Sequence, residues 1–230
     1  MEGLAFRDLE AIRAMPRYYE WKSGLVGKHA GRRILEVGCG TGLLLERLGG
    51  RELLAGIDRD SGCVQSARER LTGIKGVDIR LMDVLSPEFA SLATLRPDTV
   101  VFSNVLEAVD EERALRNAIS ILPPGGRVVI FTSAMPSLEG GLDHSYGQKR
   151  YSKKGLQDAM TTAGFTVNLI RHVNMLGAFG WWLDSQVLRK REMSPGAYRM
   201  RDMLVPFART LDALTGPPFG RSLLAVGTRG

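Results

Sequence analysis

Three glycines follow a short apolar run near the start of the chain and could place a ligand against bare backbone. The run Ile34–Val37 leads into Gly38, Gly40 and Gly42, and apolar residues at helical spacing come next. Glycines at these positions leave room for a ligand and permit turns with positive φ. The free N–H groups at the start of a following helix favour an anionic group such as a carboxylate or a phosphate. The pattern predicts an anion-binding loop between a strand and a helix.

The spacing of the glycines argues against two common nucleotide-binding loops. A dinucleotide fingerprint, Gly-x-Gly-x-x-Gly, would need its third glycine where the chain has Leu43. The sequence also lacks the phosphate loop Gly-x-x-x-x-Gly-Lys-Ser/Thr. A nicotinamide cofactor or a nucleoside triphosphate is therefore disfavoured as the ligand.

Polar side chains recur where three further apolar runs end. At the first, the carboxylate of Asp58 can accept both hydrogen bonds of a ribose diol, and a solvated turn residue is the alternative. At the second, Asp83 can accept from an adenine amino group beside the backbone N–H of Val84, or it can cap a turn. The runs and the residues that close them are Leu53–Ile57 with Asp58, Val77–Leu81 with Asp83, and Thr99–Ser103 with Asn104.

The apolar runs alternate with segments of helical spacing, and this order predicts an α/β fold. The short strands lack strict alternation of apolar and polar residues, which is typical of a parallel sheet covered on both faces. We therefore expect a Rossmann-like, doubly wound, mostly parallel seven-stranded sheet that binds ligands at the carboxyl ends of its strands. Strands are predicted at 34–37, 53–57, 77–81, 99–103, 127–132, 165–171 and 223–228, and helices at 4–30, 41–48, 61–71, 111–122 and 152–163.

One domain is expected, because 230 residues suffice for one full core and are few for two. Residues 1–30 are predicted to form an N-terminal helical cap, 31–171 the core with the glycine loop, and 217–230 the last strand. Residues 172–216 are interpreted as a helical insertion between the last two strands, which could cap an acceptor molecule.

The predicted insertion, 172–216, contains helical segments that we expect to be broken at Pro195 and Pro206. Trp181 and Trp182 could form an aromatic wall for an acceptor. They could instead belong to an amphipathic helix that packs on the sheet or on a second subunit, so a homodimer stays open.

Composition and charge narrow the classes of function. The net charge of +6 and a pI near 9.6 would suit an anionic partner such as RNA, but the charges are scattered and nucleic acid is not favoured. Two cysteines cannot form a disulfide framework or a four-ligand zinc site, so no metal is expected and a cytoplasmic location is the simplest interpretation. The N-terminal stretch has no signal-peptide pattern, and no window approaches the ~18 apolar residues of a membrane span.

Taken together, these motifs resemble the class I S-adenosylmethionine-dependent methyltransferases. The stretch 34–42 is similar to the first motif of that family, 102–107 to its motif after the fourth strand, and 122–126 to its Leu-x-Pro-Gly-Gly turn. The resemblance spans roughly residues 30–170 in the expected order, and it implies a single methyltransferase domain with S-adenosylmethionine as cofactor. It implies cofactor contacts from Tyr18, Glu36, Gly38, Cys39, Gly40, Gly42, Asp58, Arg59, Asp83, Val84 and Asn104.

The resemblance extends to a bacterial subgroup of small-molecule and envelope-associated methyltransferases. The shared features are a Tyr-Tyr-x-Trp segment at 18–21 and a polar segment at 143–151. Two departures concern histidines that the subgroup usually has, because this chain has Ala108 and Gln148 in their places. A chemistry that depends on either histidine is therefore in doubt here.

The implied activity is methyl transfer to a small molecule, with oxygen favoured over nitrogen or carbon as the acceptor atom. The sulfonium is already activated, so the protein mainly aligns the acceptor, and a phenol or alcohol also needs its proton removed. His144 is the candidate base and Tyr146 a candidate for orienting the acceptor, while Arg150 could bind an anionic one. The alternatives are an RNA methyltransferase, or a binder or cyclase that uses the cofactor without methyl transfer.

Overall fold

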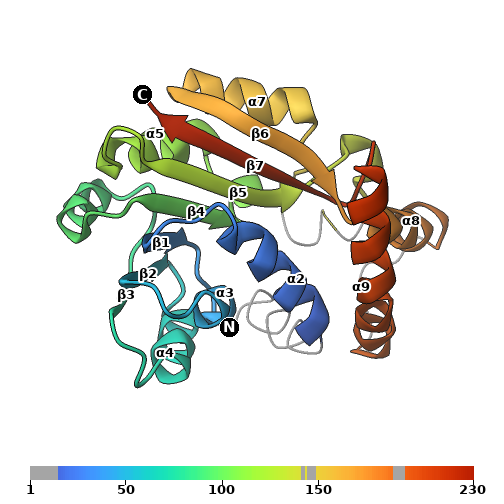
Figure 1. Ribbon diagram of the computed structural model, residues 1–230, viewed down its shortest axis with the longest axis horizontal. Helices are drawn as coiled ribbons and strands as arrows, with labels where there is room; N and C mark the ends of the chain where they lie inside the picture. The colour runs from blue at the N-terminus through green and yellow to red at the C-terminus, as the bar shows by residue number, and fades with distance from the viewer. Residues whose placement is uncertain (1–14, 141–142, 144–148, 189–194) are drawn as a thin grey trace.

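A seven-stranded sheet forms the centre of the protein (Figure 1). The computed structural model describes residues 15–140, 143, 149–188 and 195–230. The strand order is β3-β2-β1-β4-β5-β7-β6, and β7 runs antiparallel to both of its neighbours while the other pairs are parallel. The Rossmann-like, mostly parallel sheet confirms the predicted fold class. The strands are β1 (Arg33–Val37), β2 (Leu53–Asp58), β3 (Val77–Leu81), β4 (Thr99–Ser103), β5 (Arg127–Ser133), β6 (Phe165–Val173) and β7 (Ser222–Arg229).

Helices cover both faces of the sheet and bury two apolar cores. Successive residues of a strand point to opposite faces, so Leu35 packs in the core under α5 and α7, while Ile34 packs in the core under α2, α3, α4 and α9. The α-helices are α2 (Pro16–Gly27), α3 (Leu43–Arg47), α4 (Ser61–Arg70), α5 (Glu111–Ile121), α7 (Lys153–Thr162), α8 (Met175–Trp182) and α9 (Pro195–Thr215). Three segments are 3₁₀-helices, η1 (Pro87–Leu95), η2 (Leu106–Ala108) and η3 (Pro136–Leu138), and η4 (Leu183–Val187) is a π-helix.

Side chains next to the helix starts explain where several helices begin. Asp60 accepts a hydrogen bond from the N–H of Cys63 at the start of α4, and Asp110 does so from Arg113 at the start of α5. Ser152 caps α7 in the same way. Each cap satisfies an N–H group that has no partner inside its helix.

The helix α9 differs from the prediction that the chain breaks at Pro206. The helix runs without interruption from Pro195 to Thr215 and contains Pro206. A proline inside a helix removes one backbone hydrogen bond and costs about 3 kcal/mol. Contacts of α9 with both α2 and α8 offset that cost, because most helix stability in proteins comes from packing.

Two buried carboxylates of α9 hold the first turns of two other helices. Helix α2 has no side-chain cap of its own, and Asp202 accepts from the N–H groups of Tyr18 at 2.9 Å and Arg17 at 3.3 Å. Asp212 accepts from the N–H groups of Asn174 at 2.5 Å and Met175 at 3.1 Å, where α8 begins. Helix α9 therefore fixes elements from both ends of the chain.

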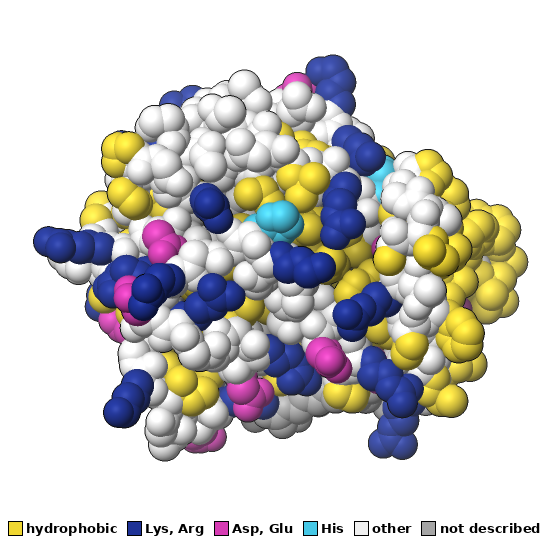
Figure 2. Space-filling view, viewed as in Figure 1, with side chains coloured by type: hydrophobic (Ala, Val, Ile, Leu, Met, Phe, Trp, Pro, Cys, Tyr) yellow, Lys and Arg dark blue, Asp and Glu magenta, His cyan; other side chains and the backbone are white. Residues whose placement is uncertain are grey.

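The surface separates charged and apolar side chains. Figure 2 shows Lys and Arg spread over one face, interspersed with Asp and Glu, while apolar side chains gather at the edge where α8 and α9 lie. Exposed apolar residues of these helices include Phe179, Trp182, Met203 and Phe207. Within the described residues, no helix combines the length and the apolar character that a membrane span requires.

We predict that Asp202→Ala lowers the free energy of unfolding by about 1–2 kcal/mol, because it removes the cap of α2. Urea unfolding measures the change. The matched control is Asp158→Ala, which removes an exposed pair with Lys154 on α7 and should cost no more than about 0.5 kcal/mol. Equal losses in the two variants would contradict the assigned role of Asp202.

Candidate cofactor and acceptor site

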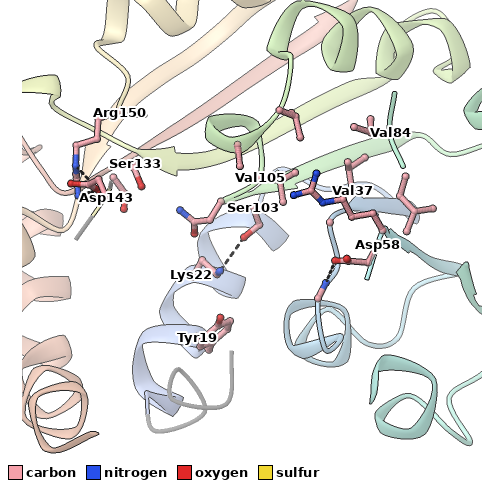
Figure 3. A pocket seen from close by; sticks show the side chains of 18 of the residues that line it. Tyr19, Lys22, Val37, Asp58, Val84, Ser103, Val105, Ser133, Asp143 and Arg150 are labelled. Atoms are coloured by element: carbon pink, nitrogen blue, oxygen red, sulfur yellow. Dashed lines mark hydrogen bonds and ion pairs between the residues drawn. The ribbon is translucent and has the colours of Figure 1, made fainter. Parts of the chain in front are cut away.

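A cavity of about 480 Å³ lies at the carboxyl ends of the parallel strands (Figure 3). The last residues of four strands line it, namely Val37 of β1, Asp58 of β2, Ser103 of β4 and Ser133 of β5. The first residue of the antiparallel β7, Ser222, lies at the same edge and lines it as well. The volume is typical of a small-molecule site. The cavity thus crosses the sheet from the β3 side to β7.

The glycine loop forms one end of the cavity. Gly38 and Gly40 line it, with φ of +67° and +52°. A Cβ on Gly38 would lie 2.2 Å from Cγ2 of Val105. The carboxylate of Asp58 anchors the loop, because it accepts from the N–H of Gly40 at 2.8 Å and from that of Asp60 at 2.9 Å (Figure 3). A carboxylate has about four lone-pair sites, so Asp58 can accept further hydrogen bonds from a ligand.

Two further predicted residues line the same part of the cavity. Asp83 accepts from the N–H of Leu85 at 2.8 Å through Oδ1, and Oδ2 has no hydrogen-bond partner within the described residues. Asp83 therefore caps a turn and also offers a free acceptor to a ligand. Asn104 has φ of +57° and donates to the buried Glu107 at 3.1 Å. Tyr18, Arg59 and Val84 also line the cavity.

Three residues that the resemblance implied as cofactor contacts lie behind the cavity wall. Glu36 is buried, and its Oε2 has no hydrogen-bond partner in the described part of the chain. The thiol of Cys39 is directed at β2, within 2.9 Å of where a Cβ on Gly56 would lie, and burial raises its pKa. Gly42, with φ of +78°, lets α3 approach α4 at Ala67. These positions shape the loop from behind rather than face the cavity.

A lysine that sequence reasoning did not single out occupies the middle of the cavity. Lys22 of α2 is 5% exposed, and its Nζ donates to Oγ of Ser103 at 2.9 Å (Figure 3). The Nζ atom lies 4.5 Å from the centre of the Tyr19 ring. Burial lowers the pKa of Lys22 to about 8 and raises that of Glu36 to about 8, while their mutual attraction opposes both changes. The signal in the sequence was a lone lysine beside the aromatic segment 18–21.

The far end of the cavity is built on an ion pair and an indole ring. Arg150 contacts Oδ1 of Asp143 through Nε at 3.0 Å and Nη2 at 2.9 Å, and it donates to the carbonyl of Ala134 at 2.8 Å. Trp181 donates to Asp143 at 3.4 Å. Figure 3 shows this pair beside Ser133, at the opposite end of the cavity from Asp58. Arg221 also lines this end.

The remaining predicted residues either lie outside the described residues or do not line the cavity. His144 and Tyr146, the candidate catalytic residues, lie outside the described residues. Trp182 is 49% exposed and does not line the cavity, whereas Trp181 does. The hydroxyl of Tyr151 donates to Glu111 and also lies within 3.1 Å of the carbonyl oxygen of Leu106, and Tyr151 does not line the cavity either.

The sheet and a glycine-lined cavity with carboxylates after β2 and β3 define an α/β protein that binds a nucleoside-type cofactor. A family model described as methyltransferase domain matches residues 11–170, so the chain belongs to the methyltransferase domain family. S-adenosylmethionine is accordingly its cofactor.

Individual relatives agree with the family. The ubiquinone biosynthesis O-methyltransferase of Aeromonas salmonicida is 34% identical over 134 residues, which are 57% of this chain and 55% of that protein. The chain spans about half the length of the curated relatives it matches. The geranyl diphosphate C-methyltransferase of Streptomyces coelicolor has a TM-score of 0.64 at 14% identity, covering 91% of this chain and 77% of that one. The [4+2]-cyclase SpnF has a TM-score of 0.61 at 20% identity, covering 91% and 81%. Both structures share the fold.

We predict that Gly38→Ala weakens binding of S-adenosylhomocysteine at least tenfold and destabilises the protein more than Gly73→Ala does. Both alanines would adopt a positive φ, at a cost of about 1–2 kcal/mol. A Cβ on Gly73 meets nothing within 4 Å, whereas one on Gly38 clashes with Val105 and displaces the loop. Calorimetric titration and urea unfolding measure the two effects. Wild-type affinity in Gly38→Ala would contradict the assignment of the loop.

Proposed function

We propose that this protein transfers the methyl group of S-adenosylmethionine to an oxygen atom of a small molecule. The observation that supports the proposal is the continuity of the cavity, which extends from the glycine loop and Asp58 to Trp181 and Arg221. One continuous cavity can therefore hold a cofactor at the β1–β3 side and an acceptor at the β5–β7 side. The O-methyltransferase relative favours oxygen as the acceptor atom.

Three charged side chains are proposed to hold the cofactor. Asp58 accepts from the ribose diol, and the free Oδ2 of Asp83 accepts from the adenine amino group. The ammonium of Lys22 lies at the end of β4, the strand next to β1, and is proposed to bind the carboxylate of the methionine portion. The adenine, the ribose and the carboxylate of the cofactor would then lie in sequence along the strand order β3-β2-β1-β4.

When bound, the cofactor supplies an electrophilic methyl group on a sulfonium. The protein's contribution is to orient the acceptor oxygen in line with the carbon–sulfur bond, and positioning of this kind can supply ~7–11 kcal/mol. A hydroxyl acceptor must also release its proton to a base. Asp143 lines this end but is paired with Arg150. His144 remains the proposed base.

A second candidate is a reaction that retains the cofactor without consuming it. The likeness in fold to a [4+2]-cyclase and the alanine at position 108, which lines the cavity, favour this alternative. The two reactions differ in one product, because methyl transfer releases S-adenosylhomocysteine in step with the methylated acceptor. Turnover of an acceptor without S-adenosylhomocysteine would favour the second candidate.

Binding of S-adenosylhomocysteine to the purified protein tests the cofactor half of the proposal. We predict one site per chain, and at least a tenfold loss of affinity in Asp58→Ala, because the ribose diol loses its acceptor. The matched control is Asp78→Ala, which removes an aspartate on β3 that pairs with Arg80 and does not line the cavity. Absence of binding to the wild type would contradict the proposed function.

Lys22 predicts a specific dependence of cofactor binding on pH. Its lowered pKa of about 8 means that the ammonium loses its proton as the pH rises through 8. Affinity for S-adenosylhomocysteine should therefore fall between pH 7 and pH 9, and this fall should be smaller in Lys22→Met.

Comparison of two variants isolates the Lys22 effect from the titration of the ligand's own amino group. Lys22→Met should weaken binding about tenfold or more at pH 7, as expected for loss of a charge-assisted hydrogen bond. Lys154→Met removes an exposed lysine from α7 and should leave both affinity and pH profile unchanged. The same pH profile in wild type and Lys22→Met would contradict the role of Lys22.

A further inference from the structure

A guanidinium to which the described residues give no carboxylate partner lies at the far end of the cavity. Arg221 directly precedes β7 and is partly buried, and its Cζ lies 4.2 Å from the centre of the Trp181 ring. Within the described residues, its guanidinium makes no ion pair and no hydrogen bond. Its contact with the protein is thus a cation–π contact, which leaves the N–H edge of the guanidinium available.

Among the residues that the structure describes, the neighbouring arginines have carboxylate partners and Arg221 has none. Arg150 is paired with Asp143, and Arg201 with Asp184. Burial, together with the positive charges of Arg201 and Arg150, lowers the pKa of Arg221 to about 10, while the phenols of Tyr18 and Tyr198 act in the opposite direction. Arg221 is therefore still charged at neutral pH.

A partly buried cation without a counter-ion is energetically unfavourable, and an anion that enters the cavity removes that penalty. The site is preorganised for such an anion. Asp143 fixes the indole of Trp181 through Nε1, and the indole in turn supports the guanidinium of Arg221. A planar guanidinium can bind a carboxylate through two parallel hydrogen bonds.

The position of Arg221 separates it from the proposed cofactor carboxylate. Lys22 contacts Ser103 at the end of β4, and Arg221 precedes β7, two strands further along the sheet. Adjacent strands lie about 4.8 Å apart, so these two strand ends are about 10 Å apart. A second anionic group must therefore come from the other ligand.

We propose that Arg221 binds the carboxylate of the methyl acceptor, so that the site selects carboxylic acids with an apolar body over their neutral analogues. This inference rests on the proposed function. A carboxylate, with one negative charge, matches the one positive charge of the Arg221 guanidinium, whereas a phosphate monoester has about −1.5 to −2. Tyr18 lines the same cavity and offers an aromatic surface to the apolar body.

Matched neutral and acidic probes test the proposal. The wild-type protein, saturated with S-adenosylhomocysteine, is titrated calorimetrically with 2-naphthoate and with 2-naphthamide. The acid should bind about tenfold more tightly or better, as expected for a charge-assisted bidentate pair. In Arg221→Gln the acid-to-amide ratio should fall close to one, and in Arg221→Lys part of the preference should remain. Arg116→Gln, which removes an exposed arginine from α5, should keep the wild-type ratio.

Three results would overturn the assignment of Arg221. The first is equal binding of acid and amide by the wild type, or binding of neither. The second is an Arg221→Gln variant that weakens binding of S-adenosylhomocysteine while the acid-to-amide ratio persists, because the guanidinium would then belong to the cofactor. The third is tighter binding of 2-naphthyl phosphate than of 2-naphthoate.

The experiment also separates this inference from the proposed function. Affinity for S-adenosylhomocysteine is measured first without a probe, and its absence contradicts the proposed function alone. The acid-to-amide ratio is then measured on the ligand-free protein as well, so that the assignment of Arg221 is tested in either case. Circular dichroism establishes whether each variant is folded. The acid-to-amide ratio of the wild-type protein tests the proposal even if a variant fails to fold.

Discussion

The two buried carboxylates of α9 are the interactions on which the cavity depends. The sheet supplies the floor, but the walls come from α2 near one end of the chain and α8 near the other. Asp202 and Asp212 satisfy N–H groups at the starts of these helices, which would otherwise lack partners. Lys22 and Trp181 are placed over the strand ends as a result. Helix α9, which lies between β6 and β7 in the sequence, thus determines where Lys22 of α2 and Trp181 of α8 lie in the cavity.

Charge is distributed along the cavity in a definite order. Carboxylates occur at the end of β2 and after β3, the ammonium of Lys22 lies at the end of β4, and the guanidinium of Arg221 precedes β7. The nucleoside of the cofactor is therefore assigned to β2 and β3, and the carboxylate of the cofactor to β4. The carboxylate of the acceptor is assigned to β7. In this account the sheet orders the two ligands, so that the methyl group and the acceptor oxygen meet near β4 and β5.

The sequence predicted the parts of this arrangement that depend on local chemistry. The strands, the glycine loop and the caps at Asp60 and Ser152 follow from neighbouring residues, and they agree with the structure within a few positions at each end. Asp58 and Asp83 could be singled out because each closes an apolar run. The Rossmann-like sheet could therefore be expected without knowledge of any long-range contact.

The parts that sequence reasoning missed depend on contacts between distant segments. Asp202 and Tyr18 are 184 positions apart, and no local pattern connects them. Packing against two helices also explains why α9 continues through Pro206. Lys22 and Arg221 look like ordinary surface cations in the sequence, and become site residues because α2 and β7 bring them to the sheet edge. Glu36 belongs to the loop motif but lies behind the wall, since alternate residues of β1 face opposite sides.

A crystal structure of the complex with S-adenosylhomocysteine would test the central claim most directly, namely that one cavity holds the cofactor between β3 and β4 and leaves the β7 side for an acceptor. The account predicts the adenine at Asp83, the ribose diol at Asp58 and the carboxylate at Lys22, with the guanidinium of Arg221 free of the ligand. A ligand carboxylate bound by Arg221, or a nucleoside located away from Asp58 and Asp83, would contradict it.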